Sequence, residues 1–170
     1  MERQPSALTL SEDDRRVLAV WAADCAERTL PLYEAQAPND TRPRDAIEGL
    51  RAFARGELRV GPARALSVGA HAAARAVGDP AAVAAARAAG QAVAVAHMAA
   101  HARGVVYAAI AAGLAAPDDP NAVAAEARWQ LEHASPTVRE VLRRLPVPPR
   151  ATKSTLALLI ADLHMSVTRG

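Results

Sequence analysis

Apolar side chains recur along this chain at steps of three and four residues, a spacing that places them on one face of a helix. One such stripe near the start is formed by Val17, Leu18, Trp21 and Cys25. No stretch alternates apolar and polar positions over the length of a strand, and β-branched residues are sparse. The pattern therefore predicts an all-α protein, an irregular or orthogonal bundle of about seven helices.

Proline marks where several of these helices should begin. A capping residue followed by proline in the first turn is a typical helix start, and four pairs fit it: Gly61-Pro62, Asp79-Pro80, Asp119-Pro120 and Ser135-Pro136. Ser11 with Asp14 three residues later is similar to a capping box. With a further start before Pro43, these signals predict helices over residues 11–30, 43–55, 62–77, 120–133, 136–145 and 154–167.

The middle of the chain, residues 80–116, is dominated by alanine, the strongest helix former. One continuous helix there would be about 55 Å long at roughly 1.5 Å per residue, which is long for a single domain. We therefore expect a bend or break near Arg103-Gly104. Aromatic residues make up 3% of the chain, so the core must be built mainly from Ala, Val and Leu.

The last 25 residues of the chain, 146–170, differ in character from the rest. Residues 146–150, Pro-Val-Pro-Pro-Arg, cannot continue a helix and should form a stiff connector. We expect residues 1–145 to form the helical bundle domain. Residues 146–170 would then supply the connector and a C-terminal helix that packs on the bundle or on a partner. An exposed apolar face from Leu156 to Leu163 would favour a homodimer.

Charge and cysteine content narrow the class of protein. The 20 basic and 18 acidic residues give a net charge of +2, and most arginines have acidic residues nearby, so nucleic-acid binding is not expected. A single cysteine excludes an internal disulfide. The opening residues do not read as a signal peptide, and the longest weakly apolar stretch is too short to span a membrane. We expect a cytoplasmic protein.

Two histidines one helical turn apart, His97 and His101, form the first candidate site. On a helix this spacing places both rings on one face, close enough to share a zinc or iron ion. A metal needs three or four ligands, so Asp24, Glu27 or His71 would have to join them. A proton-transfer role is a further alternative.

The favoured interpretation is that both imidazoles are buried in the core and hydrogen-bonded to an acidic residue, with no cofactor. Gly90, His97 and Gly104 repeat every seven residues, so this face should meet another helix closely. Buried polar groups usually have a structural partner. His71, which has Arg75 one turn later, either joins the two histidines or lies on a solvated face. Tyr107 either places its hydroxyl near the histidines or anchors the helix bend.

The second candidate is the side of the first helix that carries Trp21, Asp24, Cys25 and Arg28. A catalytic Cys25 would need a histidine base within reach. The favoured interpretation is a buried thiol beside a core tryptophan, with an Asp24–Arg28 ion pair at the bundle edge. No phosphate-binding loop, GxSxG motif or paired CxxC motif is present, so we expect a protein that is not an enzyme.

Three blocks of this sequence resemble a known family: LSEDDRRVLAVWAADCAER at 10–28, AHMAAHARG at 96–104 with Tyr107 following, and EARWQ at 126–130. They are similar to the immunity-protein-five-like putative immunity proteins, small all-α bacterial proteins that are sometimes mislabelled as exonuclease subunits. The resemblance covers Ser11 to Leu145. It implies a role rather than a reaction, namely neutralising a toxin by binding it.

Two hypotheses follow. The first is an immunity-type protein that binds a toxin through exposed charged residues, with the acidic edge at 12–14 and the basic helix at 139–144 as expected contributors. The second is a small-molecule or metal-binding protein, either a self-resistance binder or an enzyme, that uses a pocket at Asp24, His97 and His101. DNA processing ranks below both, because the arginines are scattered.

Overall fold

Side-chain oxygens cap the N-termini of three of the expected helices. The Ser11 hydroxyl accepts the N–H of Asp14 at 3.1 Å, and the Ser135 hydroxyl accepts that of Val138 at 3.2 Å. The carboxylate of Asp79 accepts the N–H of Ala82 at 2.8 Å. These bonds satisfy N–H groups that have no partner inside a helix. The capping signals in the sequence are thus confirmed at these three positions.

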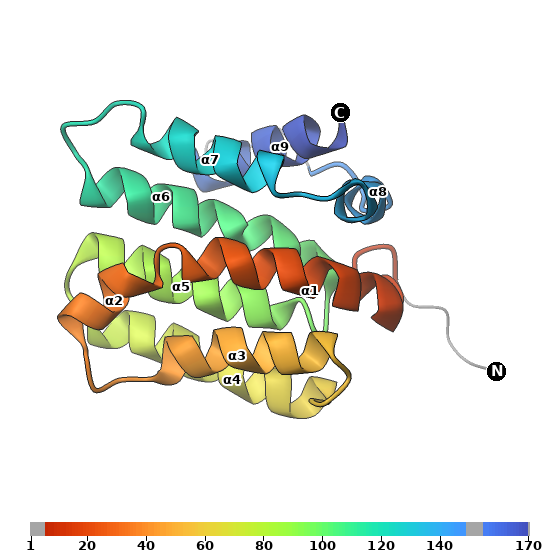
Figure 1. Cartoon of the computed structure of the whole chain (residues 1–170), viewed down its shortest axis with the longest axis horizontal. Coiled ribbons are helices and arrows are strands. Elements are labelled where there is room, and N and C mark those ends of the chain that lie inside the picture. The colour runs from red at the N-terminus through yellow and green to blue at the C-terminus, as the bar shows by residue number, and fades with distance from the viewer. Residues whose placement is uncertain (1–5, 149–154, 170) are drawn as a thin grey trace.

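The computed structural model describes residues 6–148 and 155–169, and in these ranges the chain is helical and contains no strand (Figure 1). The all-α prediction is therefore confirmed. The elements are α1 Glu12–Glu27, α2 Leu30–Gln36, α3 Arg42–Ala54, α4 Val60–Ala76, α5 Pro80–Ala94, the 3₁₀ helix η1 Ala99–Val105, α6 Val106–Ala115, α7 Ala122–Glu132, α8 Pro136–Arg143 and α9 Thr155–Thr168.

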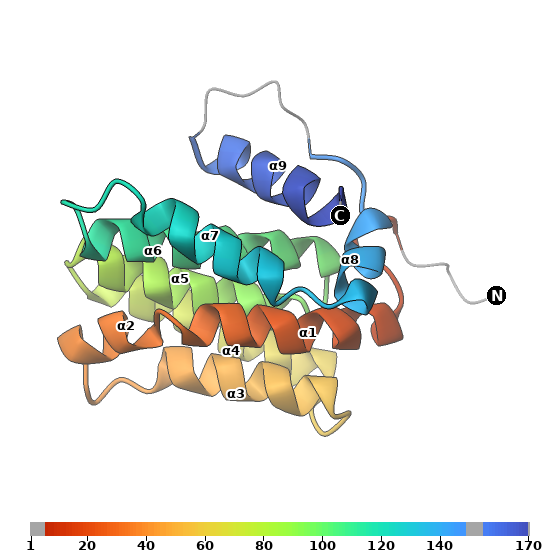
Figure 2. The same cartoon turned by 45° about the horizontal axis from the view of Figure 1, so that its top comes forward.

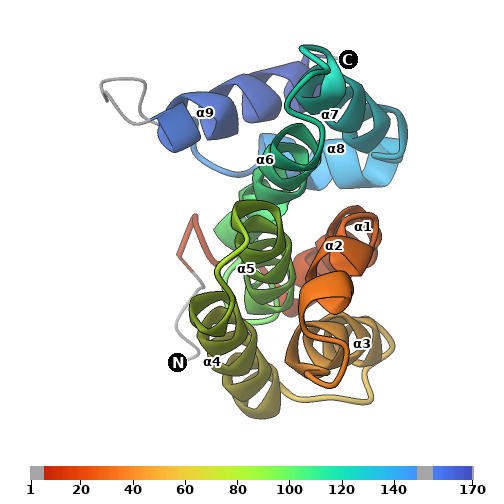
Figure 3. The ribbon, with the colours of Figure 1, turned by 90° about the vertical axis from the view of Figure 1, so that its left-hand side faces the viewer.

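Helix α5 lies at the centre of the bundle. It packs against α1, α2, α3, α4 and α6, and it also contacts η1. Its buried residues are alanines, one glycine and one valine, so neighbouring helices can approach its backbone closely. Viewed end-on in Figure 3, α3 and α4 lie at one end of the bundle, and α7, α8 and α9 lie at the other. Helix α4 is an edge element whose main neighbours are α3 and α5.

The alanine-rich segment breaks earlier than expected. Helix α5 ends at Ala94, and Met98 adopts an extended backbone with φ −154°. The partners that stabilise this break come from the start of the chain. The Arg15 guanidinium donates to the carbonyl of Ala96 at 3.0 Å, and the N–H of Ala99 donates to the carbonyl of Thr9 at 3.2 Å. The helix therefore breaks between Ala94 and Ala99, where these distant groups bind, and not near Arg103-Gly104 as expected.

Three other boundaries differ from the prediction. The first helix ends at Glu27, and a separate α2 begins at Leu30 with Pro31 in its first turn, where the missing N–H of proline costs nothing. Helix α4 begins at Val60, two residues before Pro62. Helix α7 begins at Ala122, after a turn that contains Pro120.

The C-terminal helix packs on its own bundle. Helix α9 contacts α6, α7, α8 and η1, and it buries Ala161, Leu163 and His164 (Figure 2). The apolar run proposed for a homodimer is therefore largely covered, although Leu158 remains 42% exposed. The connector beyond Pro148 and the expected helix start at Ser154 lie outside the described residues. No helix in the described ranges is long and apolar enough to cross a membrane.

Candidate functional site

Cys25 of α1 is fully buried in the hydrophobic core. Burial raises the pKa of its thiol well above the ordinary value, and the nearby carboxylates of Glu126 and Asp24 raise it further. A thiol is nucleophilic only as thiolate. The geometry therefore does not equip Cys25 to act as a nucleophile.

The charged residues of the same block find partners on other helices. Arg28 binds Glu126 of α7 through Nε at 2.9 and 3.0 Å, and its guanidinium lies 4.0 Å from the centre of the Trp129 ring. Asp24 instead accepts from Arg51 of α3 at 3.0 Å. The expected Asp24–Arg28 ion pair is therefore wrong. Each of the two residues faces a different neighbouring helix.

The histidines do come together, although His97 lies in the break after α5 and His101 in η1. Their ring centroids are 5.0 Å apart, with the planes tilted by 55°. The Nδ1 of His101 lies 2.8 Å from Oε1 of Gln91, so its partner is a neutral amide, and the expected acidic partner is wrong. Because that amide oxygen can only accept, Nδ1 of His101 carries the proton. Nδ1 of His97 and Nδ1 of His71 are buried without a hydrogen-bond partner among the described residues.

The histidine cluster, His71, His97 and His101, is held in its neutral form. Burial, together with His97 and His71, lowers the pKa of His101 to about 4. Burial also lowers the pKa of His71 and of His97. The charged side chains that add to these shifts are all arginines: Arg75 and Arg87 at His71, and Arg15 and Arg64 at His97.

The structure does not assemble the proposed metal set. Asp24 is exposed and bound to Arg51 between α1 and α3, away from the histidines at the far end of α5. In the part of the chain that the structure describes, no three His, Cys, Asp or Glu residues are arranged to hold a metal ion. Tyr107 is half-buried on α6, where it packs against the hydrophobic core.

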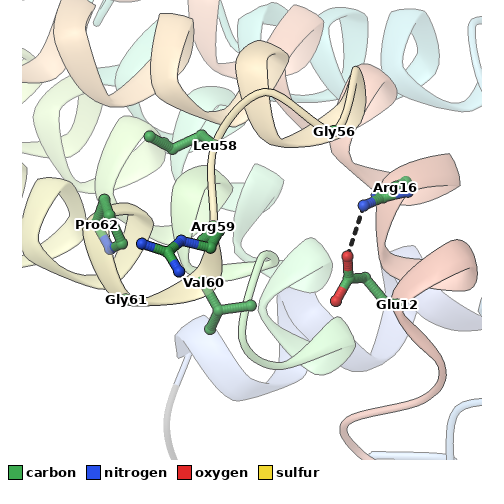
Figure 4. Close-up of a pocket in the computed structure, with 8 residues that line it drawn as sticks. All are labelled: Glu12, Arg16, Gly56, Leu58, Arg59, Val60, Gly61 and Pro62. Carbon is green, nitrogen blue, oxygen red and sulfur yellow. Dashed lines mark hydrogen bonds and ion pairs between the residues drawn. The ribbon is translucent and has the colours of Figure 1, made fainter.

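The pocket drawn in Figure 4 lies elsewhere, between the start of α1 and the turn that leads into α4. It has a volume of about 520 Å³. Arg59 lines one side with Val60, while Arg16 and Glu12 form an ion pair of 2.6 Å on the other. The remaining lining residues are Gly56, Leu58, Gly61 and Pro62. Sequence reasoning missed this site, because its two sides lie more than 40 positions apart in the chain.

The charged segments expected to bind a toxin are largely paired within the protein. Glu12 binds Arg16, and Asp14 binds Arg144 of α8 at 2.8 Å, so the acidic edge and the basic helix neutralise each other in part. Arg143 pairs with Glu140 at 3.4 Å. These segments therefore offer few uncompensated charges to a partner.

Four other arginines have no such compensation. The side chains of Arg59, Arg64, Arg75 and Arg87 make no ion pair or hydrogen bond with any described residue. Residues 58–117 contain five arginines and a single acidic residue, Asp79, which caps α5. The sequence contains this local excess of basic residues, but the net charge of the whole chain, +2, does not reveal it.

Comparison with known proteins gives one match. The model of the Imm-5 like putative immunity protein family matches residues 8–137, which run from the start of the described chain into α8. No curated protein and no solved structure matches the chain. The matched range includes the Trp21 block, the histidine cluster and the pocket of Figure 4, and it stops short of α9.

Proposed function

Because the chain belongs to the Imm-5 like putative immunity protein family, we propose that it neutralises a partner toxin by protein–protein contact in the cytoplasm of the cell that makes it. The family match over residues 8–137 is the observation that carries this proposal. An inhibitor of this kind acts by covering a surface of its target, so it needs a rigid scaffold with exposed contact residues and no catalytic centre.

The arrangement of the reactive side chains supports binding rather than chemistry. The thiol of Cys25 is buried in the core. Among the described residues, the charged side chains around the histidine cluster are arginines, with no carboxylate that would make one of its members a general base. The alternative, a metal or small-molecule pocket at Asp24, His97 and His101, has no observation in its favour, because Asp24 does not face the histidines.

The proposal is tested by finding the toxin and measuring protection. The full chain with an affinity tag is expressed in its own cells, and each retained protein is identified by mass spectrometry. Each is then expressed in a host with and without the chain. We expect one retained protein to kill the host alone, to be tolerated in the presence of the chain, and to form a stoichiometric complex with it. If no retained protein is toxic, or if co-expression gives no protection, the proposal is rejected.

A further inference from the structure

We infer that the outer face of α4, together with the pocket at its first turn, is the surface that binds an acidic face of the partner protein. This inference rests on the proposed function, and it names the surface and the partner chemistry. The face is defined by Arg64, Val68, His71 and Arg75, called here the α4 stripe. Arg87 of α5 and Arg59 of the pocket border it.

The α4 stripe is one continuous side of a helix. Its residues follow at steps of four, three and four, which keeps them on a single face. Arg64, Val68 and Arg75 are exposed, and His71 is half-buried beneath them. Val68 is 68% exposed, more than any other large apolar side chain of the described residues. An apolar centre flanked by charged side chains is the usual composition of a protein interface.

The charges of this surface are uncompensated. Burial together with Arg87 and Arg75 lowers the pKa of His71, and burial together with Arg64 and Arg15 lowers that of His97, so arginines of α4 and α5 lie near the histidine cluster. The arginines on the faces around α1 and α3 bind carboxylates, as Arg51 does with Glu27 at 2.6 Å. A guanidinium pairs best with a planar carboxylate through two parallel hydrogen bonds. A partner rich in Asp and Glu would supply the carboxylates that this face lacks.

The pocket extends the stripe at its amino-terminal end. Val60 lies one helical turn before Arg64, and a Cβ built on Gly61 meets nothing within 4 Å, so the opening is unobstructed. The side chain of Arg59 has no partner among the described residues, whereas Arg16 on the opposite side is paired with Glu12. A cavity of about 520 Å³ with the Arg59 guanidinium on one side and an apolar wall can admit an acidic side chain from the partner.

A protein fits this surface better than a nucleic acid. Proteins that bind single strands stack bases on aromatic side chains, and the α4 stripe and the pocket contain none. Duplex binding relies on many phosphate contacts, whereas only four uncompensated arginines lie here, around a valine. The chemistry of this surface therefore favours carboxylates presented by a folded protein.

The test compares two charge reversals of equal size in the full chain. Arg64→Glu with Arg75→Glu changes the α4 stripe. Arg128→Glu with Arg169→Glu makes the same change at two exposed arginines on other parts of the surface, whose side chains have no partner among the described residues. The probes are a capped decamer of glutamate, a 20-base-pair DNA duplex, and the toxin identified above. A third variant, Gly61→Leu, fills the pocket opening without changing charge.

We expect the stripe reversal to weaken binding of the glutamate decamer and of the toxin at least tenfold, with slower association at low salt. The control reversal should change either affinity less than threefold, and Gly61→Leu should weaken the toxin complex. Circular dichroism verifies that each variant is folded. The inference is overturned if both reversals weaken decamer binding equally, because net charge alone then explains it. It is also overturned if the duplex binds more tightly than the decamer with the same sensitivity to the stripe reversal.

The two proposals fail separately. If the variant with the stripe reversal neutralises the toxin as well as the unmodified chain does, the surface assignment is wrong and the immunity role stands. If the stripe reversal weakens binding of the decamer and the control reversal does not, but no retained protein is a toxin, the acidic-ligand surface stands and the immunity role is rejected.

Discussion

The indole N–H of Trp21 donates to the main-chain carbonyl of Gln130 across 3.0 Å, which joins α1 to the last turn of α7. The last four carbonyls of a helix have no partner within it, so this bond satisfies a group that would otherwise be buried without one. The side chain of Gln130 in turn donates to the carbonyl of Val105 at 2.9 Å, at the end of η1. Three elements distant in sequence are thus fixed through one glutamine.

Replacing Trp21 should therefore cost stability through this bond. We expect Trp21→Phe to lower the free energy of unfolding by about 1–3 kcal/mol, because it leaves a buried carbonyl unsatisfied and reduces packing in the core. Urea unfolding followed by circular dichroism measures the change. Trp129→Phe, at a half-buried ring with no such bond, is the control and should cost less than half as much.

Replacing Gly104 and Gly61 by alanine should change the stability of the protein in opposite directions. A Cβ at Gly104 would lie 2.4 Å from Cβ of Gln91, so Gly104→Ala should destabilise the protein by about 1–3 kcal/mol. Gly61 lies in the first turn of α4 with nothing within 4 Å of the added atom, so Gly61→Ala should stabilise by about 0.5–1 kcal/mol. Thermal unfolding of both variants gives the sign, and equal destabilisation by both would contradict the packing described around Gly104.

Stability should fall as the pH drops below about 6.5. Burial lowers the pKa of His101 to about 4, and burial together with Arg103 lowers that of His164 to about 4. The folded state disfavours the charged imidazoles. The two histidines therefore contribute fully to the free energy of unfolding above the unfolded pKa of 6.5, and this contribution is lost as the pH falls towards 4. The loss amounts to roughly 3 kcal/mol for each histidine, as an upper value.

Unfolding free energies measured between pH 7.5 and 4 test this. His101→Gln with His164→Gln should flatten the dependence in that window. His133→Gln, at an exposed histidine on the end of α7, is the control and should leave the slope as it is. An unchanged slope in the double variant would mean that other groups cause the acid sensitivity.

Cys25 should be inert while the protein is folded. Burial and nearby carboxylates raise the pKa of its thiol, and the side chain is inaccessible to solvent. We expect a thiol reagent such as DTNB to react with the native protein at least a hundredfold more slowly than with the protein in denaturing urea. Fast stoichiometric reaction of the native protein would contradict the burial of Cys25.

Features set by neighbouring residues could be predicted from the sequence, and features set by distant residues could not. Ser11, Asp79 and Ser135 cap helices through bonds to residues three positions ahead, so local pattern was sufficient. The break after α5 depends on the bond of Arg15 to Ala96, 81 residues away.

The same limit applies to the candidate site. The proximity of His97 and His101 follows from their spacing, but the partner of Asp24 does not, since it lies on another helix. Which arginines lack a carboxylate is likewise a three-dimensional property. The sequence showed only that Asp79 is the sole acidic residue among residues 58–117.

The bonds of Leu8 and Thr9 to the backbone around Ala99 have a consequence for biosynthesis. During synthesis, Leu8 and Thr9 must wait for a segment made some ninety positions later before the backbone groups that bind them exist. Until then, the opening turn of α1 and Arg15 lack their native contacts. A bulky fusion placed directly before residue 8 would crowd that late closure, whereas one placed after α9 would not.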